Sequence, residues 1–235
     1  ETARASLELA LECGGSDLPR PYVNVASFEY DIGDLVGAER HHREGLALAE
    51  RLGNRAGADW LAAEVAFDCF ERGAWDEALA DAQRLLRRRT ERGTVHYLDP
   101  TLRLAEAAIV LAREGRLPDG VLDDTLRTAR TIGDVQLLVP TLGHAARIFS
   151  ESGRPVDTEA CLAECLEAKG SAASYTAAGS WTVAATLAWL NVKREPLPEG
   201  LLLGDDVPWR QAARLMRDGD LVAAAHVLAE IGARA

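Results

Sequence analysis

The chain of 235 residues is predicted to fold as an all-α array of helical hairpins, and three observations support this prediction. A turn of one outline recurs along the chain, and a second series of glycines repeats with nearly the same period. No segment alternates polar and apolar residues between hairpin turns, so a sheet is not expected. Because a helix pair of this size cannot bury its own apolar stripe, neighbouring pairs must stack into a superhelix.

The recurring turn has a glycine, a bulky or rigid residue two positions later and a small residue five positions later. Its copies are Gly33, Leu35 and Ala38; Gly73, Trp75 and Ala78; Gly115, Leu117 and Gly120; Gly153, Pro155 and Thr158; and Gly219, Leu221 and Ala224. The glycine lets the first helix end in a left-handed conformation, the bulky side chain fills the corner, and the small residue lets the second helix approach closely.

The spacing of the glycines gives a period near 40 residues. The first four turn glycines are 40, 42 and 38 residues apart. A second series, spaced 40, 40 and 37 residues apart, falls where the second helices should end. Its members are Gly53, Gly93, Gly133 and Gly170.

The helices are expected in the following order. Residues 1–14 should form the second helix of a truncated hairpin, and Pro19 and Pro21 should mark a linker after it. Asp99 should cap the first helix of the third complete hairpin, with Pro100 at the first helical position. The four complete hairpins are expected at 22–32 with 35–52, 56–72 with 75–90, 100–113 with 121–131, and 136–152 with 156–169.

The C-terminal part departs from the period. A long helix over 173–192 should be followed by a proline-containing linker at 194–208, and a shorter hairpin should pair 209–217 with 221–231. The expected organisation is an array over 1–193, the linker, and a terminal hairpin over 209–235 that continues the array. Since the chain starts without methionine and stops just after a helix that lacks a partner, we expect it to be a segment of a larger protein.

Charge and hydropathy argue against nucleic-acid and membrane partners. A net charge of −11 repels phosphate backbones and anionic lipids. The most apolar run, 181–192, has 12 residues, fewer than the ~20 that span a bilayer. The one cationic cluster lies in the last turns of a helix, where arginine complements the helix dipole. Its members are Arg84, Arg87, Arg88, Arg89 and Arg92. A cytoplasmic protein with reduced thiols is expected.

The sequence carries no recognisable motif for catalysis, cofactor binding or metal binding. It lacks a P-loop, a dinucleotide fingerprint, a zinc-protease helix and a nucleophile elbow. We therefore predict no enzyme activity, no catalytic residue, no cofactor and no metal site. The pairs Asp123 with Asp124 and Asp205 with Asp206 fit solvated helix starts better than paired catalytic carboxylates.

The histidines and cysteines also favour structural roles. His41 and His42 point about 100° apart on a helix, which suits a solvated face better than a shared metal ion. His144 and His226 sit singly in apolar helices and are expected to be hydrogen-bonded core residues. The alternative for Cys161 and Cys165, four residues apart, is half of a soft-metal site, but packing in the core is preferred.

A partner-binding surface is the remaining hypothesis. In superhelices of helical hairpins the first helix of each pair lines the concave wall, where aromatic and arginine side chains can anchor a partner. The alternative for the aromatic residues, Phe67 in particular, is packing between helices. The candidate residues are Tyr22, Ser27, Tyr30, Asp31, Trp60, Glu64, Phe67, Glu71, Arg103, Glu106, Arg113, Arg147 and Glu151.

The turns resemble the tetratricopeptide repeat (TPR), and Gly73, Trp75 and Ala78 fit its pattern best. A spacing near 40 residues departs from the standard 34 and resembles the longer version found in large bacterial signalling ATPases. The segments 22–27, 45–53, 75–79 and 229–232 are similar to the C-terminal repeats of AAA/STAND regulators that are linked to class III adenylate or guanylate cyclase domains or to LuxR-type DNA-binding domains. None of that family's catalytic or nucleotide-binding motifs is present.

The resemblance implies a right-handed superhelix that binds a partner protein, a peptide or a small-molecule inducer and passes this occupancy to the other domains of the parent chain. A self-association scaffold that forms a homodimer is the main alternative. An enzyme with a pocket in the superhelix is a further alternative, which the absence of recognisable motifs disfavours.

Overall fold

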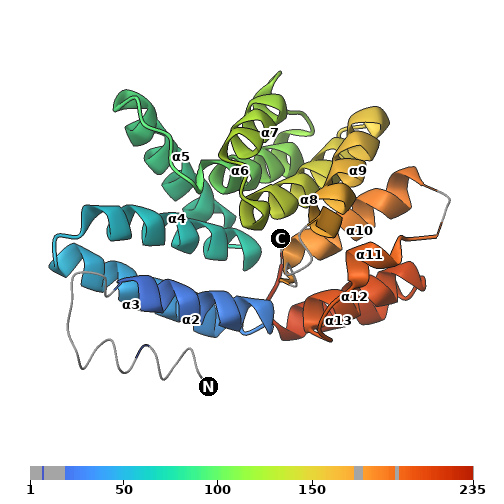
Figure 1. The fold of residues 1–235 in the computed structure, drawn as a ribbon, viewed down its shortest axis with the longest axis horizontal. Coiled ribbons are helices and arrows are strands. Elements are labelled where there is room, and N and C mark those ends of the chain that lie inside the picture. Colours follow the sequence, from blue (N-terminus) through green and yellow to red (C-terminus); the bar gives the residue numbers. More distant parts are fainter. Residues whose placement is uncertain (1–6, 8–18, 172–176, 194–195, 235) are drawn as a thin grey trace. The chain divides into compact units, whose positions relative to one another are not determined.

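The computed structural model describes residue 7 and residues 19–171, 177–193 and 196–234, and every regular element among them is a helix (Figure 1). The fold is therefore all-helical in the described part, as predicted. The expected helix over 1–14 lies outside the described residues. The chain divides into two compact units, Glu1–Thr94 with Ile231–Ala235, and Val95–Glu230. This boundary falls within the span that was expected to form one array.

The described part of the first unit forms two successive helical hairpins (Figure 1). Its described helices are α2 (Pro19–Asp31), α3 (Leu35–Arg51), α4 (Arg55–Glu71) and α5 (Trp75–Glu91). Each helix packs on the next, and α2 also packs on α4. The turn glycines Gly33 and Gly73 have φ values of 87° and 78°, so the predicted left-handed turns are confirmed.

Local signals explain where the helices of this unit begin and how closely they pack. The side chains of Asp34 and Asn54 each accept a hydrogen bond from the backbone N–H three residues later, at 2.9 Å, and so cap α3 and α4. Gly45 of α3 faces Tyr22 of α2, and a Cβ atom at position 45 would lie 2.7 Å from the Tyr22 Cβ. Glycine is therefore required for the close approach of α2 and α3.

The second unit contains the remaining helices. They are α6 (Asp99–Glu114), α7 (Val121–Ile132), α8 (Val135–Glu151), α9 (Pro155–Ser171), α10 (Ser180–Val192), α11 (Glu199–Leu202), α12 (Pro208–Arg217) and α13 (Leu221–Glu230). α8 packs on α6, α9 and α10, and α12 packs on α10 and α11. One apolar cluster runs through these contacts and includes Leu142, Phe149, Leu162, Trp181 and Ala213. The terminal hairpin thus packs on the helix that precedes it.

The N-terminal boundaries of two helices differ from the prediction. A linker was expected at Pro19, but α2 begins there. Proline is tolerated in the first turn of a helix because the backbone N–H groups of that turn have no partner within the helix. Asp99 lies inside α6 and Leu98 is the capping residue. The Asp99 side chain instead accepts a hydrogen bond from the His96 backbone N–H at 2.8 Å.

The prediction was also wrong in the C-terminal part. Gly170 does not end α9, which continues to Ser171, and it lacks the positive φ of the other three glycines in its series. α10 begins at Ser180, after three non-helical residues, and not near 173. The expected linker contains the one-turn helix α11. Among the described residues, no helix combines the length and the hydropathy that a membrane span requires.

Candidate functional site

One face of α4 carries several of the residues expected to bind a partner. Trp60, Glu64, Phe67 and Glu71 are spaced by four, three and four residues, so they form one stripe along the helix. The indole Nε1 of Trp60 donates a hydrogen bond to Glu64 Oε1 at 2.9 Å. Trp60, Glu64 and Phe67 are all partly exposed, whereas Glu71 is only 2% exposed.

A tyrosine from α2 extends this stripe. The ring of Tyr30 lies 6.4 Å from the ring of Phe67, at an interplanar angle of 49°. The Phe67 ring also lies 5.9 Å from the ring of Phe70, which is buried. We call the four partly exposed residues the α2/α4 stripe: Tyr30, Trp60, Glu64 and Phe67. The structure thus brings together residues of two successive hairpins that were expected to act together.

Other candidates in the first unit do not join the stripe. Tyr22 packs in a small core with Val25 and Leu48, and this burial leaves it little surface for a partner. The same correction applies to Glu71, whose side chain is buried. Asp31 is partly exposed, next to Tyr30 in the sequence, and Ser27 is exposed. The Ser27 hydroxyl donates to the Val23 carbonyl within its own helix, at 2.9 Å.

The five remaining candidates belong to the second unit. Arg147 and Glu151 form an ion pair with each other on α8, at 2.8 Å. Arg103 and Glu106 are partly exposed on α6, and Arg113 is exposed near its end. All five residues lie on α6 and α8, so they are not part of the α2/α4 stripe.

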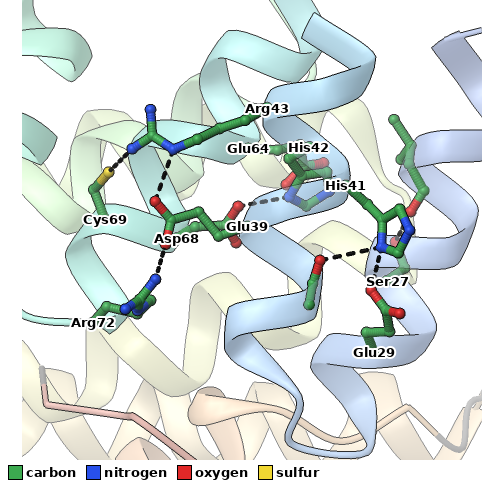
Figure 2. A network of polar contacts seen from close by, with 12 residues as sticks. Ser27, Glu29, Glu39, His41, His42, Arg43, Glu64, Asp68, Cys69 and Arg72 are labelled. Carbon is green, nitrogen blue, oxygen red and sulfur yellow. Dashed lines mark hydrogen bonds and ion pairs between the residues drawn. The ribbon is translucent and has the colours of Figure 1, made fainter.

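A buried histidine–carboxylate pair lies beside the stripe. His42 of α3 and Asp68 of α4 are 4% and 3% exposed, and His42 Nδ1 lies 2.7 Å from Asp68 Oδ2. Figure 2 shows this contact, with Glu64 beside His42. Because the carboxylate accepts from Nδ1–H, the other ring nitrogen, Nε2, has a lone pair when the imidazole is neutral. This Nε2 atom is buried and has no hydrogen-bond partner in the described structure.

A second histidine links α2 to α3. His41 Nδ1 lies 2.6 Å from Glu29 Oε2 and 3.1 Å from the Gly37 carbonyl oxygen. Both neighbours are acceptors, so Nδ1 carries the proton and donates. Glu29 is 3% exposed. The prediction that His41 and His42 occupy a solvated face was therefore wrong, because each ring pairs with a carboxylate between two helices.

Arginines complete the network on the side of α5 (Figure 2). Arg43 contacts Glu39 through Nε and Glu77 through Nη2, each at 2.8 Å, and Arg72 also pairs with Glu39. The Arg43 guanidinium donates to Cys69 Sγ at 3.3 Å. Burial raises the pKa of the Cys69 thiol to about 12, which favours the protonated thiol over the thiolate at neutral pH.

The pKa shifts follow from burial and from the crowding of carboxylates. Burial raises the pKa of Glu64, and the charge of Asp68 raises it further. Burial also raises the pKa of Asp68, against the effect of His42. For His42, burial lowers the pKa, but the charges of Asp68, Glu64 and Glu29 together raise it above its ordinary value. These groups can therefore change protonation in response to pH or to a bound charge.

Signals for this network were present in the sequence but were given too little weight. Glu64 and Asp68 stand four residues apart in the stretch 60–70, which is otherwise apolar, and charged residues are rarely buried without partners. His41 and His42 precede Arg43 on α3, the helix that packs against α4. The pairing itself depends on the register between α3 and α4, which one sequence does not fix.

The other histidines and cysteines differ in their burial and in their contacts. Cys161 and Cys165 are buried in the apolar cluster of the second unit. His144 Nε2 lies 3.1 Å from the Ser180 hydroxyl, whereas His226 is exposed, contrary to the expectation that it packs in the core. The described residues include no group of three histidine, cysteine or carboxylate side chains suited to a metal ion.

The arginine cluster of α5 binds the neighbouring helix. Arg88 and Arg89 both pair with Asp59 of α4, and Arg89, which is 3% exposed, also donates to the Asp59 carbonyl oxygen at 3.0 Å. Arg84 pairs with Asp81 at 2.8 Å. At least three of the five arginines thus have intramolecular partners.

Comparison with protein-family models and with curated proteins finds no match for this chain.

Proposed function

We propose that the chain is a non-catalytic, TPR-like interaction and sensing segment of a larger cytoplasmic bacterial signalling or transcription-regulating ATPase. In this proposal the α2/α4 stripe binds a partner protein, a peptide or a small-molecule inducer. The observation that carries the proposal is the stripe itself, where Tyr30 of one hairpin meets Phe67 of the next and Trp60 is oriented by Glu64. Partly exposed aromatic side chains of this kind are among the residues that most often anchor partners.

The packing order supports a TPR-like array. In the first unit, α2 and α4, the first helices of successive hairpins, contact each other directly. In the second unit, α6 packs on α8 and α8 packs on α10 in the same way. Repeated contact between first helices is what a superhelix of hairpins requires, and such an array presents these helices on its inner wall. The right-handed superhelix belongs to this proposal.

A ligand on the stripe would act on the packing of the hairpins. The residues of the stripe come from α2 and α4. A ligand that contacts both helices therefore stabilises one arrangement of the two hairpins over others. The ligand shifts the equilibrium between these arrangements by as much as its affinities for them differ. The change in arrangement can then be passed along the chain to an output domain.

Site-directed photo-crosslinking in the source cells tests this proposal. A photoreactive phenylalanine analogue is placed at Trp60, and at the exposed residue Ala80 of α5 as a control. We expect one specific adduct from position 60 that is weakened when Phe67→Ala is introduced. Equal adducts from both positions, or adducts from the control alone, would contradict binding at the stripe.

Self-association remains the second candidate because α13 exposes apolar side chains. Leu221 and Val222 are 57% and 69% exposed, and Ala224 is buried. Sedimentation velocity over a range of concentrations tests it. A mass that doubles with concentration and returns to that of the monomer in Val222→Glu would favour the scaffold over the sensor.

A further inference from the structure

The polar network of the first unit is short of positive charge near the stripe. It contains five carboxylates (Glu29, Glu39, Glu64, Asp68 and Glu77), against two arginines and two histidines. Both arginines, Arg43 and Arg72, are bound to Glu39, and Arg43 also to Glu77. Among the described residues, neither arginine nor lysine forms an ion pair with Glu64, whose only hydrogen bond is from the Trp60 indole.

A buried ring nitrogen next to Glu64 also lacks a hydrogen-bond partner in the described structure. His42 donates Nδ1–H to Asp68, so its Nε2 atom is an acceptor in the neutral imidazole and has no partner in the described structure. Figure 2 shows the side chain of Glu64 beside His42. Glu64, whose carboxylate accepts only from the Trp60 indole among the described residues, has spare acceptor capacity for a donor that carries positive charge.

The rings of the stripe suit the same ligand. Trp60, one helical turn before Glu64, and Phe67, nearly one turn after it, flank the carboxylate along about 10 Å of α4. Tyr30 reaches Phe67 from α2, with 6.4 Å between the ring centroids. Aromatic faces attract ammonium and guanidinium groups, and most strongly where water is partly excluded.

We infer that the α2/α4 stripe recognises a cationic side chain, lysine or arginine, on a peptide segment of the partner, with Glu64 as its counter-ion between the rings of Trp60 and Phe67. This inference rests on the proposed function and adds the chemistry of the partner to it. Charge complementarity selects the occupant, because an acidic segment would meet Glu64 and the buried carboxylates behind it without compensation.

Fluorescence anisotropy with defined peptides tests the inference. The probe is a labelled decapeptide of alternating lysine and alanine, and the comparison peptide alternates glutamate and alanine. We expect the full chain to bind the lysine peptide and not the glutamate peptide. Glu64→Gln keeps the shape of the side chain and an acceptor for the Trp60 indole, yet should weaken binding about tenfold, as expected for a lost charge-assisted hydrogen bond.

A charge-matched variant separates this site from general attraction to an acidic protein. Glu50→Gln removes the same charge from an exposed position at the end of α3 and should change the affinity less than about twofold. Similar weakening by Glu50→Gln and Glu64→Gln would overturn the inference, as would equal binding of both peptides or absence of binding.

A spectroscopic readout keeps the test valid if Glu64→Gln lowers stability. The indole N–H signal of Trp60, assigned with Trp60→Phe, should shift when the lysine peptide is added to the unaltered chain, and an unshifted signal would contradict the inference. The photo-crosslinking experiment is independent of peptide charge. An adduct at position 60 with an acidic or apolar segment would therefore preserve the proposed function and overturn the cationic ligand.

Discussion

The two units both bury charged side chains, but they satisfy these charges with different partners. In the first unit His42 and His41 pair with the carboxylates of Asp68 and Glu29 across helix interfaces. In the second unit Lys169 is buried and donates through Nζ to the carbonyl oxygens of Gly200 and Leu201, at 2.6 and 3.1 Å. Arg210 is also buried there, and its Nη1 donates to the Asp205 carbonyl oxygen at 2.8 Å.

This difference decides in which unit the partners of the buried charges can themselves gain or lose a proton. Backbone carbonyls do not titrate, so the cations of the second unit hold α9 and the segment around α11 together in one charge state at neutral pH. Burial, with a further effect of Arg210, lowers the pKa of Lys169 to about 8, which still leaves it mostly charged at pH 7. The carboxylates and imidazoles of the first unit can each gain or lose a proton. The first unit is therefore the one suited to sense a charge.

The largest effect is expected from a truncation in the apolar core of the second unit. Phe149 is 1% exposed and belongs to the cluster that joins α6, α8, α9 and α10. Phe149→Ala should lower the free energy of unfolding by about 3–5 kcal/mol, because it removes packing and leaves a cavity. Hydrogen–deuterium exchange should show faster exchange in α6–α10. Equally accelerated exchange in α2–α5 would mean that the two units unfold as one cooperative body.

Removal of one member of the buried pair in the first unit should have the next largest effect. Asp68→Ala leaves His42 without its carboxylate in an environment that water cannot reach, and should cost about 3 kcal/mol. The double variant His42→Leu with Asp68→Leu removes both charges and should recover most of that loss, since buried pairs contribute little beyond their own desolvation. Denaturant unfolding measures both. A double variant as unstable as Asp68→Ala would indicate that the pair is required for the α3–α4 packing itself.

The repeating elements of the fold were predictable because they depend on short-range chemistry. The turns at Gly33, Gly73, Gly115, Gly153 and Gly219 follow from a positive φ that glycine adopts readily, and all five have it. The prediction failed where a local pattern allows two outcomes. Pro19 can end a linker or begin a helix, and Gly170 can end a helix or lie within one.

The site was predictable only in part, for a different physical reason. The i, i+4, i+7 spacing placed Trp60, Glu64 and Phe67 on one face of a helix. The sequence did not reveal that His42 meets Asp68, since 26 residues separate them and the contact depends on how α3 and α4 are aligned. Burial of Tyr22 likewise depends on packing against α3, at the position where Gly45 lets the helices approach.

A change of pH should move the stability of the two units in opposite directions. In the first unit, the folded state raises the pKa of His42, Asp68 and Glu64, so it binds more protons than the unfolded chain. The stability that these groups contribute is present in full below their unfolded pKa values and is lost as the pH rises through the folded values. The first unit should therefore become more stable when the pH falls from 7.5 to 5.5.

The second unit should lose stability over the same change. Burial, with a further effect of Arg147, lowers the pKa of His144 to about 3. Between pH 6.5 and 3 the unfolded chain therefore binds more protons than the folded chain, and the free energy of unfolding falls by at most about 1.4 kcal/mol for each pH unit.

Hydrogen–deuterium exchange at pH 5.5 and 7.5, corrected for intrinsic rates, should show greater protection of α3 and α4 and weaker protection of α8. His144→Gln should abolish the second change and His42→Gln should reduce the first. If protection changed in the same direction in both units, the contrast between their buried charges would not govern their response to pH.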